Sequence, residues 1–267
     1  MARPIRVAAA GDVHCDEVNR DEIERAFARI DGEVDAILLA GDLTTYGELE
    51  QGELLAEICA PLETPVYAVL GNHDWNCNQA GELTAALEAA GVGMIDRGHA
   101  IQELDGASLG IAGAKGFVGG FPDSALPDFG EPLLRQVYAE TTAEVEALEA
   151  GLAVIGGCDY RIALLHYAPT ASTLEGEPRG IYAFLGSDRL AVPIVQHHPH
   201  LALHGHAHVG AFQGAVGDVP VYNVSVPSLA RGFFVFELDG DAVQVALAVA
   251  CDGVVRTGVL RRGVRLK

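Results

Sequence analysis

The chain has 267 residues, 49% of them hydrophobic, and a formal net charge of -20. This length suffices for a sizeable core in one domain. The strong negative charge disfavours long nucleic acids as partners, because binding their phosphates depends on lysine and arginine. No run approaches the ~20 apolar residues of a membrane helix, and no secretory segment precedes the first strand-like run. We therefore expect a soluble, cytoplasmic protein that does not bind membranes.

The first third of the chain alternates apolar runs with helix-like stretches. Strands are predicted over 5–10, 36–40 and 65–70, and helices over 19–30 and 48–59. This βαβαβ pattern is typical of parallel strands joined by right-handed crossovers. The continuous apolar character of 36–40 indicates a strand covered on both faces.

The middle of the chain changes character. Two strand-like runs, 99–104 and 107–112, flank Asp105–Gly106, a turn signal that predicts a hairpin. The segment 113–130 follows, rich in glycine and phenylalanine, and its length and composition indicate an active-site lid. Its residues Phe117, Val118 and Phe121 would be exposed and, with residues 182–185, could form a homodimer contact.

The last part begins with a predicted helix over 131–152, whose apolar residues recur every three or four positions. Further predicted strands follow, at 161–165, 201–204, 219–224, 233–238 and 242–250. No repeat or linker divides the chain, so residues 1–267 are expected to form one domain. The five cysteines are scattered without a CxxC pair, which favours packed thiols in a reducing compartment.

Polar residues able to bind metal stand at the carboxyl ends of five predicted strands, the edge where open α/β sheets bind ligands. They are Asp12, His14, Asp42, Asn72, His73, Asp74, His166, His206 and His208. Glycines precede four of these groups and would let the backbone approach an ion closely. Mixed imidazole and oxygen donors suit Zn, Mn, Fe or Co, and two ions ~3.5–4 Å apart require a bridging ligand such as a carboxylate.

The motifs D-x-H, GD, GNHD, H and GHxH occur in this order between residues 11 and 208. In this order they resemble the calcineurin-like metallophosphoesterase superfamily. The resemblance implies an α/β fold, a four-layer α/β/β/α sandwich of two mixed sheets, with a dinuclear metal site at one edge. It further implies a phosphoric ester hydrolase that uses two divalent metal ions.

The resemblance also assigns roles to residues by matching positions. One metal would be held by Asp12, His14 and His208, and the other by Asn72, His166 and His206, with Asp42 bridging. His73 matches the histidine that contacts the phosphate and protonates the leaving alkoxide. Asp74 is expected to orient His73. The stretch Asn223–Ser225 matches a family segment incompletely and is expected to be structural. Apart from the resemblance, His99, His197, His198 and His200 are expected to be structural, while His204 either ends a strand, which is favoured, or supports a ligand's ring.

Substrate selection is expected to depend on residues 168–187, which follow His166 directly. Arg179 and Lys115 are scarce positive charges that could bind a substrate phosphate, although Arg179 could equally pair with Glu175 or Glu177. A small phosphodiester attacked by a metal-bridging hydroxide is the first choice. A phosphomonoester or phosphoprotein on the same site is the alternative, and a metal-dependent binding module without catalysis is a third hypothesis.

Overall fold

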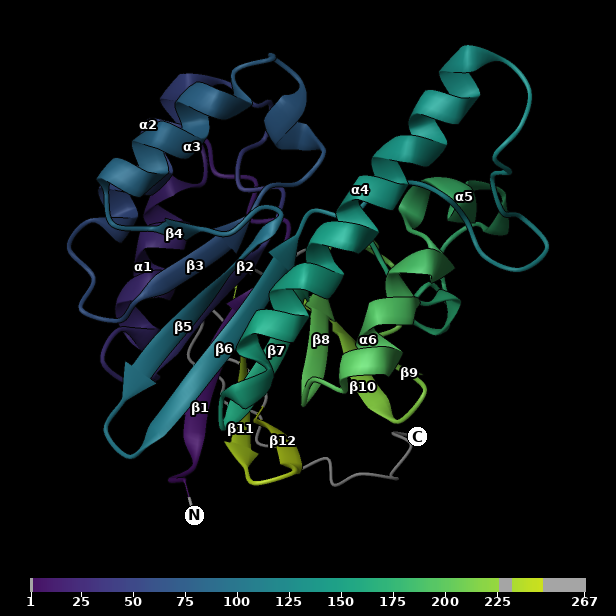
Figure 1. The fold of residues 1–267 in the computed structure, drawn as a ribbon. Coiled ribbons are helices and arrows are strands. Elements are labelled where there is room, and N and C mark those ends of the chain that lie inside the picture. The colour runs from purple at the N-terminus through teal and green to yellow at the C-terminus, as the bar shows by residue number, and fades with distance from the viewer. Residues whose placement is uncertain (1, 226–231, 247–267) are drawn as a thin grey trace.

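The chain folds around two six-stranded sheets in the computed structural model, which describes residues 2–225 and 232–246 (Figure 1). The first sheet has the order β12-β11-β1-β2-β3-β4. Its strands are β1 (Ile5–Ala10), β2 (Ala36–Ala40), β3 (Val66–Val69), β4 (Gly93–Met94), β11 (Phe234–Asp239) and β12 (Ala242–Ala246). Strands β1 to β4 are parallel, and β11 and β12 extend the sheet as an antiparallel hairpin.

The second sheet has the order β5-β6-β7-β8-β10-β9. Its strands are β5 (Gly98–Leu104), β6 (Ala107–Ala114), β7 (Tyr160–Leu165), β8 (Leu201–His204), β9 (Gln213–Val216) and β10 (Val219–Asn223). The central strands β6, β7, β8 and β10 are parallel, while β5 and β9 are antiparallel edges. The carboxyl ends of the parallel strands of each sheet therefore form one edge.

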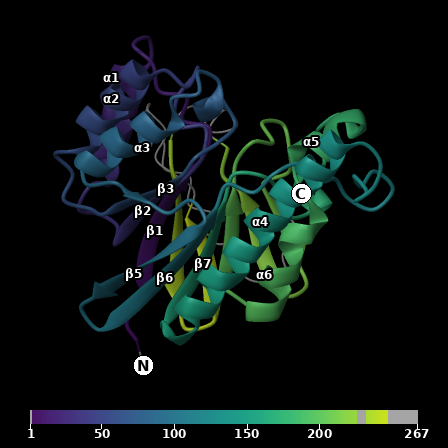
Figure 2. The ribbon, with the colours of Figure 1, turned by 45° about the horizontal axis from the view of Figure 1, so that its top comes forward.

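Helices cover the outer face of each sheet (Figure 2). The first sheet carries α1 (Arg20–Ile30), α2 (Leu49–Cys59) and α3 (Ala80–Ala89), and the second carries α4 (Pro132–Val154) and α6 (Ala191–His197). This arrangement confirms the predicted α/β/β/α sandwich of two mixed sheets. Within residues 2–225 and 232–246, none of the helices combines the length and the apolar character that crossing a membrane requires.

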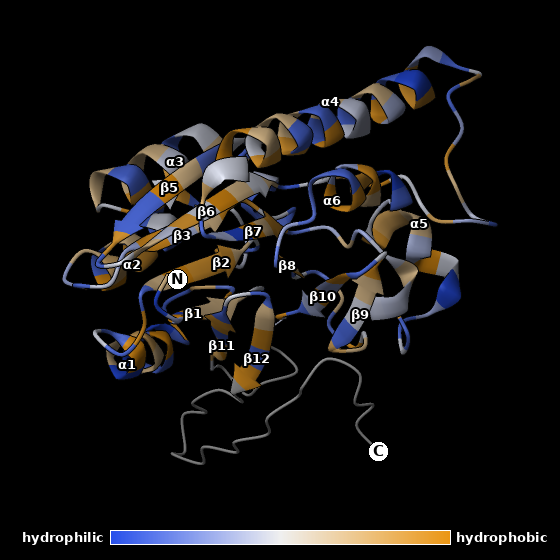
Figure 3. Ribbon diagram, turned by 60° about the horizontal axis from the view of Figure 1, so that its bottom comes forward, coloured by the Kyte–Doolittle hydropathy of each residue, from blue (hydrophilic) through white to orange (hydrophobic). Residues whose placement is uncertain are grey.

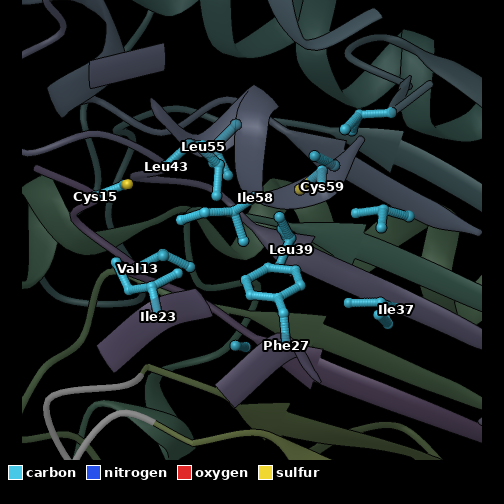
Figure 4. Close-up of a cluster of buried hydrophobic side chains, with 14 of the residues drawn as sticks. Val13, Cys15, Ile23, Phe27, Ile37, Leu39, Leu43, Leu55, Ile58 and Cys59 are labelled. Atoms are coloured by element: carbon cyan, nitrogen blue, oxygen red, sulfur yellow. The ribbon is translucent and has the colours of Figure 1, made fainter. Parts of the chain in front are cut away.

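Three apolar layers separate the four layers of the sandwich. Alternate side chains of β2 illustrate the division, because Ile37 and Leu39 pack towards the helices while Leu38 packs between the sheets. In Figure 4, Phe27 of α1 lies against Leu39 in the outer layer. Figure 3 shows the hydrophobic character of β1 and β2, which are covered on both sides. These layers fix the strands whose ends carry the polar residues.

The predicted strands and long helices are present with small shifts of their ends. Sequence reasoning missed α3, α6, the two-residue β4, the edge strand β9 and the one-turn helix α5 (Tyr182–Leu185). These elements are short or, in α3, carry alanine at several positions, so their apolar periodicity is weak. Residues 247–250 of the last predicted strand lie outside the described residues.

The segment expected as an exposed hydrophobic lid is partly buried. Gly113 and Ala114 belong to β6, and Phe121 is 3% exposed in a small cluster with Leu174 and Leu185. Backbone bonds tie this part to residues 183–188, among them the Gly120 N–H to Gly186 carbonyl bond of 2.8 Å. Phe121 is therefore buried rather than exposed, and Phe117 and Val118 are half-buried against the core beside the second sheet. The homodimer contact stays a prediction.

Candidate metal centre and active site

Both sheets contribute side chains to one edge of the sandwich, at the carboxyl ends of their parallel strands. The first sheet supplies the residues after β1, β2 and β3, which are Asp12, His14, Asp42, Asn72 and His73. The second supplies the residues after β7 and β8, which are His166, His206 and His208. The site thus lies across the seam between the sheets.

A first group consists of Asp12, His14 and His208, whose ligand atoms lie within 4.8 Å of one another. The Nε2 atom of His208 is 3.0 Å from Asp12 Oδ1, and the His206 backbone N–H donates to the same carboxylate. Burial alone would raise the pKa of Asp12. The hydrogen bond from His208, the charges of His166 and His208 and the His206 N–H together lower this pKa to about 2. Asp12 is therefore a carboxylate held ready for a cation.

A second group consists of Asp42, His166 and His206. The His166 Nδ1 faces the Ala40 carbonyl at 2.9 Å, and since a carbonyl only accepts, Nδ1 carries the proton and Nε2 keeps its lone pair. That Nε2 lies 2.9 Å from Asn72 Oδ1 and 3.4 Å from Asp42 Oδ1. Three acceptor atoms converging in this way fit a shared metal cation.

Asp42 lies between the two groups, as the predicted bridge must. Its Oδ2 is 3.9 Å from His14 Nε2, while its Oδ1 faces His166. The carboxylate is 1% exposed, and burial, followed by the charge of Asp12, raises its pKa. Bringing Asp12 and Asp42 together in a buried place is unfavourable without a positive charge, so the donor set fits divalent metal ions.

Four of the seven predicted ligands have left-handed backbone conformations. The φ angles are 58° at Asp12, 47° at His14, 49° at Asp42 and 70° at His206. Such φ angles are uncommon outside glycine and cost energy that the surrounding structure must supply. Their clustering at one edge marks it as a functional site independently of the side-chain chemistry.

Two of the glycines that precede ligands are required by close approach. A Cβ at Gly205 would lie 2.5 Å from Asp12 Oδ2. A Cβ at Gly71 would overlap the backbone N and the Oδ1 of Asp42. Any larger residue would push a predicted ligand out of place, as expected from the sequence.

His73 stands beside the two groups, with its Nε2 3.9 Å from Asp42 Oδ2. Its backbone N–H donates to Asp42 Oδ1, and its Nδ1 faces the Thr45 carbonyl at 2.7 Å. The Thr45 carbonyl therefore fixes the ring and directs the other nitrogen towards the site. Sequence reasoning missed Thr45, because a backbone carbonyl leaves no signal in residue type.

Asp74 is fully buried and accepts hydrogen bonds from the backbone N–H groups of Leu43, Thr44 and Gly71 and from the Thr44 hydroxyl. These bonds join the loop after β2 to the loop after β3. The His73 ring is instead bonded to the Thr45 carbonyl, and the orientation of His73 by Asp74 stays a prediction.

The last residues of β10 and β8 lie beside the ligand loop. The Asn223 side chain donates to the Ala207 carbonyl at 2.6 Å, between His206 and His208. This contact agrees with the structural role expected for Asn223–Ser225. His204 ends β8, is fully buried and bonds Thr173 through its Nε2 at 2.8 Å.

The two scarce cations lie in different surroundings. Lys115 is buried, donates to the Gly116 carbonyl and lies 3.8 Å from Glu144, and burial lowers its pKa. Arg179 is exposed on the wall of a cavity of about 570 Å³ that also contains Phe121 and Tyr182. In the part of the chain that the structure describes, no ion pair joins Arg179 to Glu175 or Glu177.

A family model described as calcineurin-like phosphoesterase matches residues 5–210, a span that contains every predicted ligand. The chain belongs to this family. A calcineurin-like phosphoesterase typically binds two divalent metals, and the Asp and His groups described above are the residues that could hold them here. The family also makes the chain a member of the metal-dependent phosphoesterase hydrolases. A comparison with curated proteins finds no match.

Solved structures share the fold of this calcineurin-like phosphoesterase at low sequence identity. Phosphopantetheinyl hydrolase of Mycobacterium tuberculosis is 15% identical with a TM-score of 0.63, covering 83% of this chain and 90% of its own. A Thermus thermophilus protein is 17% identical with a TM-score of 0.59, covering 92% and 99%. A Plasmodium protein, described as the anchor in the inner membrane complex, is 16% identical with a TM-score of 0.61, covering 97% and 89%.

Proposed function

We propose that the protein hydrolyses small phosphodiesters with two divalent ions, Mn, Fe, Zn or Co. The observation that carries this proposal is the set of three overlapping three-residue groups at one edge, each including a buried aspartate, of which one contains His73 together with His14 and Asp42. One ion would be held by Asp12, His14 and His208 and the other by Asn72, His166 and His206, with Asp42 shared. When bound, the ions would activate water as a nucleophile and withdraw charge from the phosphoryl oxygens.

Residues of the chain would then donate the proton to the leaving group and hydrogen-bond the phosphoryl oxygens. With Nδ1–H donated to the Thr45 carbonyl, a protonated His73 presents Nε2–H to the leaving oxygen and supplies its proton. Asn72 turns its oxygen towards His166, which leaves its amide N–H₂ free to donate to a phosphoryl oxygen. Asp42 accepts the His73 backbone N–H and so holds the acid next to the reacting group.

The pairing of Lys115 and Arg97 with glutamates supports a diester over a monoester. Lys115 is compensated by Glu144, and Arg97 by Glu140 and Glu144. A phosphomonoester dianion would gain more than a diester monoanion from a free cation beside the metals, and neither of these groups is free. We propose that Arg179 contacts a distal polar group of the substrate from the neighbouring cavity.

A substrate panel tests this proposal. Protein loaded with Mn²⁺ is assayed on matched diesters and monoesters of the same alcohols, and we expect higher kcat/KM for the diesters. A preference for monoesters would support the alternative of a phosphomonoesterase or phosphoprotein phosphatase. Two bound metals without hydrolysis of any ester would instead support a binding module, the third hypothesis.

A further inference from the structure

A cavity of about 380 Å³ opens directly beside the metal centre. Its lining residues come from four separate segments and are Asn72, Trp75, Lys115, Phe117, Glu140 and Tyr167. The volume is within the ~300–1,000 Å³ of typical small-molecule sites. Because Asn72 is both a proposed metal ligand and a wall of this cavity, a group bound here would be attached close to the reacting phosphate.

The walls are largely aromatic. Trp75 follows His73 by two residues and is 52% exposed, so much of its indole is open to a ligand. Phe117 follows β6 and packs edge-on to Tyr167, with their ring centroids 5.9 Å apart. Flat aromatic ligands gain most from such walls, since rings stack on aromatic side chains regardless of their detailed polarity.

Tyr167 connects this cavity to the metal centre. Its ring centroid is 4.6 Å from that of His206 and 5.4 Å from that of His166. The residue is only 5% exposed and lines the cavity. Its hydroxyl is a hydrogen-bond donor, and a substrate oxygen bound in the cavity would accept from it.

The charges of the cavity exclude a second phosphate as the preferred occupant. Lys115 Nζ lies 4.5 Å from the centre of the Phe117 ring and 3.8 Å from Glu144, and Glu140 forms an ion pair with Arg97. Lys115 and Glu140 are therefore each already paired with an oppositely charged side chain of the protein. A neutral flat ring suits these walls better than an anion.

We infer that this cavity, the Trp75 pocket, binds the base of a nucleoside phosphodiester whose phosphate occupies the metal centre. The inference rests on the proposed phosphodiesterase function and names its substrate class. Trp75 stacks on the base, and the Tyr167 hydroxyl donates to an oxygen of the sugar or phosphate. Aliphatic diesters such as glycerophosphodiesters leave the aromatic walls without a partner.

Fluorescence tests binding separately from hydrolysis, because Trp75 is the single tryptophan of the chain. The protein, at fixed metal content, is titrated with adenosine 5′-monophosphate and in parallel with glycerol 3-phosphate, with N-acetyltryptophanamide correcting for absorbance. We expect saturable quenching by the nucleotide and none by glycerol phosphate. Equal responses to the two ligands, or no response, would overturn the inference even if diesters are hydrolysed.

Kinetics with matched substrates provide the second test. The methyl esters of adenosine 5′-phosphate and of glycerol 3-phosphate are compared for the wild type, Trp75→Ala and Tyr167→Phe. We expect the adenosine-to-glycerol ratio of kcat/KM to fall about 10-fold in Trp75→Ala, mainly through KM, as the loss of one stacked base predicts. Phe129→Ala, which removes an aromatic residue 69% exposed elsewhere, should keep the ratio.

The outcomes separate the two proposals. An unchanged ratio in a Trp75→Ala protein with a wild-type melting temperature would overturn the Trp75 pocket and leave the phosphodiesterase proposal standing. Failure of the wild type to hydrolyse either diester would instead refute the phosphodiesterase proposal, and the fluorescence titration would still decide what the pocket binds.

Discussion

His73 is held on both sides, by Asp42 through its backbone and by Thr45 through its ring. Because none of its contacts is needed to hold an ion in the two proposed ligand sets, His73→Ala should retain both metals. Loss of the general acid should lower kcat by ~100-fold or more for a diester with a poor leaving group, and by much less for a nitrophenyl ester, which needs no proton. Metal analysis and kcat measured on the same samples check this. Equal losses for both esters would contradict the role as an acid.

At the scale of residues, the sequence predicts the ligands because Asp, Asn and His after buried strands carry their chemistry in their side chains. The structure brings all seven together. The residues that hold them are harder to predict. Thr45 acts through its backbone carbonyl, which every residue type has. Tyr167 is an aromatic residue of the kind that ordinarily packs in a core. The sequence therefore gives no sign that either residue contributes to the site. The sequence predicts a structural role for Asn223, but its hydrogen bond to the Ala207 carbonyl is seen only in the structure.

A carboxylate accepts a hydrogen bond at the end of β3, and its raised pKa leads us to expect that the stability of the fold depends on pH. Both Asp96 oxygens accept the Leu70 N–H, at 3.1 and 3.0 Å, just before Asn72 and His73. Burial raises the Asp96 pKa to about 7. The folded protein therefore retains a proton that the unfolded chain loses near pH ~4, so this contribution to stability is present at low pH and is lost as the pH rises through about 7.

Asp96→Asn removes the charge and keeps an oxygen for the Leu70 N–H. We expect its melting temperature to match that of the wild type near pH 5 and to exceed it by a few degrees at pH 8. Thermal unfolding at the two pH values measures the difference. Asp105→Asn, at the exposed turn of the β5–β6 hairpin, is the control for charge alone. A constant difference at both pH values would show that Asp96 does not titrate in this range.

At the scale of elements, apolar runs bounded by turn residues predict most strands, since β1, β2 and β8 are buried on both faces. The pairing order was not predictable from the chain alone. In the structure β11 pairs with β1. The apolar pattern of the sequence does not distinguish this pairing from one with a strand of the second sheet, because strands of both sheets are apolar. The inward packing of 117–121 was missed because glycine-rich composition predicts an irregular backbone, and burial depends on residues 183–188.

For the whole molecule, the proposed ions join two sheets, since Asp12 and Asp42 follow strands of one and His166 and His208 follow strands of the other. Metal loading should therefore stabilise the fold, by ~2.7 kcal/mol for each ion at a free metal concentration 100 times its Kd. This corresponds to a rise of ~5–10 °C in melting temperature for each ion in a chain of this size.

Asp42→Asn weakens the shared ligand and should remove most of this rise while lowering the metal content towards one ion or none. Differential scanning calorimetry with EDTA and with Mn²⁺, beside elemental analysis, provides the measurement. The same rise in Asp42→Asn as in the wild type would show that Asp42 is not shared. The fold class, in contrast, followed from the order of the motifs, which the match over residues 5–210 confirms.

The left-handed residues of the ligand loops have a consequence for engineering. At Asp12, His14, Asp42 and His206 the backbone favours glycine, while the chemistry demands a donor side chain. Stability and function therefore oppose each other at these four positions. A redesign that selects residues by backbone preference would choose glycine at all of them, and would yield a chain with relaxed loops, an intact sandwich and no metal centre.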